Sequence, residues 1–179
     1  SVHLIIAFTI LSSLFWIFLN TLYKTKKKFF ELNRNYISLK VLLIFVFIQI
    51  VLGAFVSGLD AGRIYQTWPL MNEKFYPDDL LFDNLFNFNQ PSIVQFFHRN
   101  VAYVIFFISI YLGISIFKKK DVRLYNHFLL FFFVILLQIG LGVSVLMTGV
   151  NTYLASMHQI SSIFLVVSTL KLYHYSIRS

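Results

Sequence analysis

Five long apolar stretches leave this chain few ways to fold. They cover residues 2–23, 36–58, 95–117, 125–148 and 153–173. Each has about 20 residues, the length at which a helix crosses the roughly 30 Å hydrocarbon core of a bilayer. Residues 41–48 and 128–137 are apolar without interruption, whereas the strands of a membrane barrel would alternate with polar residues. The sequence therefore predicts an all-α polytopic membrane protein with five transmembrane helices.

Composition excludes soluble alternatives. Of 179 residues, 58% are hydrophobic and 12% are charged, whereas a soluble domain has about 25% charged residues. The chain has no cysteine, which excludes thiolate zinc sites, disulfides and covalent heme attachment through a C-x-x-C-H motif. It begins at Ser1 with no methionine and no basic segment, so we expect a truncated N-terminus rather than a signal peptide.

The basic residues predict the orientation in the membrane. Twelve of the 15 Lys and Arg residues fall on one side when the five spans alternate in direction. Most of them lie in the connections at residues 24–35 and 118–124. By the positive-inside rule this side is cytoplasmic, or faces the matrix in an organelle. The net charge of +8 is thus a signal of topology, and we expect no nucleic acid as a partner.

The connections divide the chain into three expected parts. Residues 1–23 form a transmembrane helix left from a preceding bundle, and residues 24–35 form a basic cytoplasmic loop. Residues 36–175 form a four-helix bundle with a long outer loop at 59–94. Within that loop, Asp78 and Asp79 precede apolar residues, so either could cap a short helix on the membrane surface.

An internal repeat relates the second and third apolar stretches to the fourth and fifth. Its motif is a glutamine four residues before a glycine, followed by a stretch with a histidine near its outer end. The two copies are Gln49, Gly53 and His98, and Gln138, Gly142 and His158. Two hairpins of one design therefore follow each other. By the same pattern, His3 makes the first stretch resemble the second half of an earlier hairpin.

His98 and His158 are the candidate ligands. Both stretches run from outside to inside, which puts the two imidazoles at a similar depth. Ionisable groups at membrane depth usually face the bundle interior, and two histidines at one level can ligate a heme iron from both faces. In the alternative interpretation each histidine only bonds a neighbouring carbonyl. Zinc or copper fits less well, because no cysteine or carboxylate pair completes the ligand set.

Three other charged or ionisable residues are weaker candidates. Arg99 follows His98 directly and could meet a heme propionate, or else a lipid phosphate or Asp60. His127 and His174 lie near the inner surface, and we expect them to be interfacial residues without a ligand role.

Six segments carry a resemblance to a known family. They are residues 53–65, 68–71, 77–79, 94–99, 137–142 and 155–159. The most specific are the Leu-Asp-Ala-Gly to Trp-Pro stretch at 59–69 and the Gln-x-x-His-Arg motif at 95–99. These segments resemble the C-terminal part of heme A synthase, an eight-helix family of two pseudo-symmetric bundles. The lack of cysteine is similar to the cysteine-free branch of certain bacteria and mitochondria.

The resemblance implies a role for each candidate residue. His98 and His158 would hold the iron of a heme b cofactor, with Arg99 beside it. His3 would belong to the site of the substrate heme. The partner of His3 and the acidic residue with a catalytic role in the family are absent from this chain. The catalytic residues are therefore unknown, and whether this chain is active alone stays open.

The resemblance also implies a heme-dependent oxidoreductase that oxidises a methyl group of heme O to the formyl group of heme A for cytochrome oxidase biogenesis. Its expected partners are heme O, heme O synthase, an electron donor or acceptor and the lipid bilayer. The expected location is the bacterial inner membrane, with the mitochondrial inner membrane as the alternative. A di-histidine cytochrome b exchanging electrons with quinone is the rival function, and a heme-free scaffold is a third.

Overall fold

The computed structural model describes residues 2–29, 36–81, 83 and 86–177. Within this part, the long helices are α1 (Val2–Leu22), α2 (Ile37–Gly58), α3 (Pro91–Lys118), α4 (Val122–Met147) and α5 (Thr152–Ser176), and η2 (Ala61–Arg63) is a short 3-10 turn. All five long helices are long and apolar enough to cross a membrane. The prediction of five membrane helices is therefore confirmed, with ends that differ by at most about four residues.

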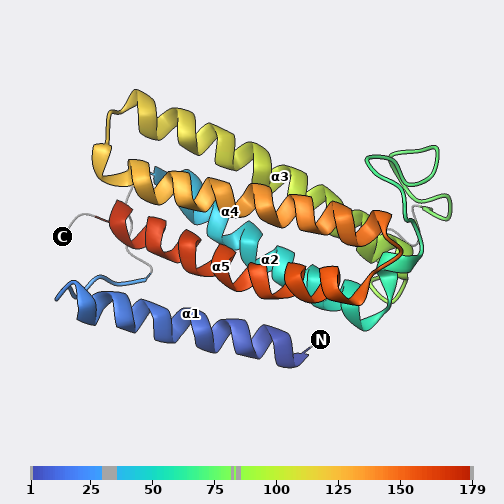
Figure 1. Ribbon diagram of the computed structural model, residues 1–179. Coiled ribbons are helices and arrows are strands. Elements are labelled where there is room, and N and C mark those ends of the chain that lie inside the picture. Colours follow the sequence, from blue (N-terminus) through green and yellow to red (C-terminus); the bar gives the residue numbers. More distant parts are fainter. Residues whose placement is uncertain (1, 30–35, 82, 84–85, 178–179) are drawn as a thin grey trace.

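The helices alternate in direction, as the distribution of basic residues predicted (Figure 1). One end of the bundle carries the N-terminus, the long loop after α2 and the connection between α4 and α5; we call it the loop end. The other carries the end of α1, the α3–α4 connection and the end of α5; we call it the basic end. Arg34 and Arg178, two of the residues used in the topology prediction, lie outside the described residues.

Two hairpins form the body of the bundle. α2 packs along α3, and α4 packs along α5, while fewer contacts join the hairpins to each other. Gly113 permits one close approach between them, because a Cβ there would lie 2.4 Å from Cζ of Phe128 on α4. α1 lies beside α5, outside the two hairpins (Figure 1).

The packed core fills the basic half of the bundle rather than its whole length. The buried residues of α4 all lie between Leu124 and Ile135, and those of α5 begin at Ser161. No residue in 136–147 of α4 or 152–160 of α5 is buried. At the loop end, the α4–α5 hairpin is therefore loosely packed, whereas residues 92–95 of α3 and Tyr65 of the loop are buried.

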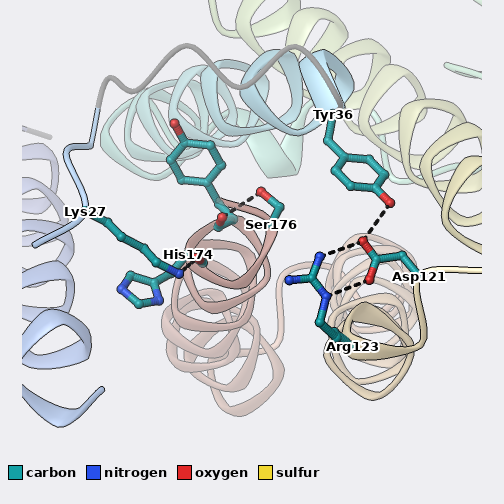
Figure 2. A network of polar contacts seen from close by, with 7 residues as sticks. Lys27, Tyr36, Asp121, Arg123, His174 and Ser176 are labelled. Carbon is teal, nitrogen blue, oxygen red and sulfur yellow. Dashed lines mark hydrogen bonds and ion pairs between the residues drawn. The ribbon is translucent and has the colours of Figure 1, made fainter. Parts of the chain in front are cut away.

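A polar cluster closes the basic end and joins α1 to α5 (Figure 2). Lys27 Nζ donates a 3.0 Å hydrogen bond to the carbonyl oxygen of His174, whose Nε2 lies 3.2 Å from Asn20 Oδ1. Nearby, Tyr36 and Arg123 both donate to the carboxylate of Asp121. His174 was expected at the interface but is only 1% exposed, because these partners satisfy it within the protein.

Local sequence explains two helix starts. α3 begins with Pro91, four residues before the predicted start, since proline is favoured in a first turn that needs no backbone N–H. Asn151 caps α5, because its side chain accepts hydrogen bonds from the backbone N–H groups of Tyr153 and Leu154.

The expected short helix after Asp78 or Asp79 falls largely on residues 82, 84 and 85, which lie outside the described residues. Asp79 accepts hydrogen bonds from the side chains of Gln90 and Ser92. The carboxylate therefore ties the loop to the start of α3.

Candidate functional site

The two candidate ligands sit at matching positions on helices that run in the same direction. His98 is the eighth residue of α3, and His158 is the seventh residue of α5. Both side chains are half-buried and lie in the second helical turn from the loop end. The structure thus places the two histidines that the sequence repeat singled out at the same end of the bundle.

Each histidine is held by the glutamine of its own hairpin. Gln49 Nε2 on α2 donates a 3.1 Å hydrogen bond to the carbonyl oxygen of His98 and lies 3.3 Å from its Nε2. In the second hairpin, Gln138 Nε2 on α4 lies 3.0 Å from the carbonyl oxygen of His158 and 3.5 Å from its Nε2. The same contacts therefore recur in both copies of the repeat.

The glycine of each motif makes space for the imidazole ring. A Cβ at Gly53 would lie 3.3 Å from Cε1 of His98. At Gly142 it would lie 3.1 Å from Cε1 of His158. Both distances are shorter than ordinary van der Waals contact, so larger residues would push the rings out of place. Glycine, glutamine and histidine thus form one constellation that occurs twice.

Buried polar atoms without a hydrogen-bond partner are concentrated around this pair. Within the part of the chain that the structure describes, these atoms are Gln49 Oε1, Gln95 Oε1, His98 Nδ1, Arg99 Nε, Tyr103 Oη and His158 Nδ1. Such groups are rare in proteins and mark functional sites or missing partners. The donor set fits a heme: His98 and His158 would hold it through imidazole nitrogens, and the unpaired polar atoms around them would be available to it.

Arg99 holds the outer loop. Its guanidinium donates hydrogen bonds to the carbonyl oxygens of Tyr65 at 2.8 Å, Thr67 at 2.9 Å and Leu70 at 3.3 Å. Gln95, one turn earlier on α3, donates to the same Tyr65 carbonyl at 2.9 Å. Two of the side chains in the Gln-x-x-His-Arg motif therefore fasten residues 65–70 beside the histidine between them. No ion pair joins Arg99 to Asp60 among the described residues.

The remaining candidates lie apart from the pair. The side chain of His3 is exposed near the start of α1 and makes no hydrogen bond within the described residues. His127 lies near the basic end, with its ring 3.8 Å from that of Tyr175. Sequence analysis missed Ser161, whose hydroxyl donates to Gln138 Oε1. Its position three residues after His158, on the same helix face, was the available signal.

These features define a class: a multi-pass helical membrane protein built from repeated hairpins, with paired histidines near one end of the bundle. Comparison with known proteins gives the particular family. The chain belongs to the cytochrome oxidase assembly protein family COX15-CtaA, which matches residues 1–170.

Curated relatives include proteins named heme A synthase. The protein of Pelagibacter ubique is 43% identical over 171 residues, which cover 94% of this chain and 49% of that protein. That of Rickettsia bellii is 39% identical over 176 residues, 92% of this chain and 50% of that protein. The protein of Rickettsia prowazekii is 37% identical over 154 residues, which cover 77% of this chain and 46% of that protein. The chain spans about half the length of these relatives, and no solved structure matches it.

Proposed function

We propose that this chain is the C-terminal, heme b-binding half of a heme A synthase of the cysteine-free branch, in the inner membrane of a bacterium. The observation that carries the proposal is the duplicated glutamine–glycine–histidine constellation in a chain of this family. Proteins named heme A synthase in Pelagibacter and Rickettsia support the activity and the bacterial location.

His98 and His158 hold the heme iron through one ring nitrogen each in this proposal. The bound heme supplies one-electron redox chemistry, which the side chains of this chain do not have. The chain's own residues do the positioning: Gln49 and Gln138 bond the helix turn that carries each histidine. Arg99 keeps the loop segment 65–70 over this end of the bundle, which restricts access of water to the site.

The reaction is the oxidation of a methyl group of heme O to the formyl group of heme A. With water as the source of the formyl oxygen, the change from methyl to formyl releases four protons and four electrons, so an electron acceptor must take the electrons. α1 would be the last helix of a preceding bundle, with His3 as one ligand of the substrate heme. The catalytic acidic residue would lie in that bundle, outside this chain. Heme O synthase is the expected partner that supplies the substrate.

A host that makes heme O but lacks its own heme A synthase provides the test. Membranes containing the full-length protein with this chain should accumulate heme A, which extraction and chromatography identify, and the purified protein should contain heme b. Bound heme b with unchanged heme O would instead favour a di-histidine cytochrome b that exchanges electrons with quinone. Absence of any heme would overturn both functions and favour a scaffold.

A further inference from the structure

The two copies of the histidine constellation differ at one position. Three residues after the histidine, the second hairpin has Ser161 and the first has Val101. The Ser161 hydroxyl lies within hydrogen-bond distance of Oε1 of Gln138 and of the carbonyl oxygen of His158, so Oε1 of Gln138 has a neighbouring donor. Valine has no hydroxyl, and Oε1 of Gln49 is buried without a hydrogen-bond partner among the described residues.

The free end of the Gln49 amide is its oxygen. The nitrogen end is fixed, because only Nε2 can donate to the carbonyl oxygen of His98. Next to this amide lies the imidazole of His98, whose Nδ1 is also buried and unpaired within the described structure. A buried acceptor and a buried ring nitrogen in contacting side chains can satisfy each other, whereas leaving both unpaired is costly.

We propose that Gln49 is a positioning residue for His98: when one ring nitrogen of His98 binds the heme iron, the N–H of the other donates to Oε1 of Gln49. At the corresponding oxygen of Gln138, the hydroxyl of Ser161 competes with His158 for hydrogen bonding. The two axial ligands of one heme are therefore unequal. This inference rests on the proposed function, because it requires a heme between the two histidines.

The difference in strength between the two histidine–iron bonds predicts the sign of a measurable change in the heme reduction potential. Histidines that bind metals usually donate their second N–H to an acceptor, which fixes the ring and makes it a stronger ligand. A stronger nitrogen donor favours the ferric state, so it lowers the reduction potential of the heme. His98 with its acceptor thus contributes the stronger bond, and His158 the weaker one.

Three substitutions test the proposal in the purified full chain with its heme. Gln49→Leu removes the acceptor, Val101→Ser introduces a hydroxyl that competes for it, and Ser161→Ala frees the oxygen of Gln138. Ser162→Ala is the matched control, because the Ser162 hydroxyl bonds only the carbonyl of Gln159 on its own helix. The readouts are the midpoint potential in a redox titration and the rate of heme transfer to apomyoglobin.

Gln49→Leu should raise the midpoint potential and weaken heme retention about 10- to 100-fold, as loss of an acceptor behind a metal-bound histidine does. Val101→Ser should raise the potential by less and keep the heme. Ser161→Ala should lower it, and Ser162→Ala should leave it unchanged. The potential shifts in opposite directions in Val101→Ser and Ser161→Ala, whereas a general loss of stability would not produce opposite shifts. If Gln49→Leu does not fold, these two variants still test whether Gln49 positions His98.

Two kinds of failure can be told apart. If the wild-type chain binds no heme, the proposed function is wrong. If it binds a low-spin heme but Val101→Ser and Ser161→Ala keep its potential, or shift it in the same direction, only the inference about Gln49 is wrong.

Discussion

At the scale of single residues, the glycine facing each imidazole has a role that a neighbouring glycine lacks. Gly140 and Gly142 lie two residues apart on α4. A Cβ at Gly142 would lie 3.1 Å from His158, whereas a Cβ at Gly140 would have no atom within 4 Å. Of these two glycines in the same helix turn, only Gly142 faces the candidate ligand among the described residues.

We expect Gly142→Leu to displace the His158 ring and to lower heme content about tenfold, because overpacking of this kind costs about 1–3 kcal/mol. Gly140→Leu has the same change in helix propensity and should keep wild-type heme content. The measurement is the ratio of heme absorbance to protein after purification. Equal heme content in the two variants would show that the glycine contact does not matter.

At the scale of elements, α3 holds the outer loop mainly through the guanidinium of Arg99, with Gln95 as a second contact. The three carbonyls that Arg99 contacts span residues 65–70, and only a guanidinium has enough donors in one plane to reach them together. Gln95 also donates to the Tyr65 carbonyl, and Asp79 is tied to the side chains of Gln90 and Ser92. Arg99 nevertheless makes more bonds to the first half of the loop than Gln95 does.

Replacing Arg99 with glutamine should loosen the loop and speed tryptic cleavage after Lys74, which is exposed. Mass spectrometry of timed digests measures this rate. Arg63→Gln is the control, because Arg63 is exposed and has no part in this contact. If Arg99 serves only a heme propionate, cleavage of the heme-free protein should be the same with and without the substitution.

At the scale of the whole molecule, the alternating helices place all basic connections at one end (Figure 1). The positive-inside rule assigns this end to the cytoplasm. A reporter that is active only outside the cytoplasm should work when inserted in the 59–94 loop and be silent when fused after Lys119. The reverse result would put the histidine pair on the cytoplasmic side of the membrane.

Sequence predicted most of the fold, because membrane helices are marked by length and apolarity alone. The repeat also predicted that His98 and His158 would lie at one depth. It could not predict the contacts of Ser161 or Arg99, which depend on how neighbouring helices and the loop pack. Nor could it predict that Asp79 accepts hydrogen bonds from Ser92 on α3 and from Gln90 just before that helix. His174 lies near the basic end as expected, but its burial was not predicted because it depends on Asn20 of α1.

The most direct test of the central claim is the absorption spectrum of the purified chain and its histidine variants. Two imidazoles on one iron give a six-coordinate, low-spin heme. His98→Ala and His158→Ala should each shift the spectrum toward high-spin character or lose the heme, while His127→Ala, near the basic end, should leave it intact. An unchanged low-spin spectrum in both His98→Ala and His158→Ala would contradict the account.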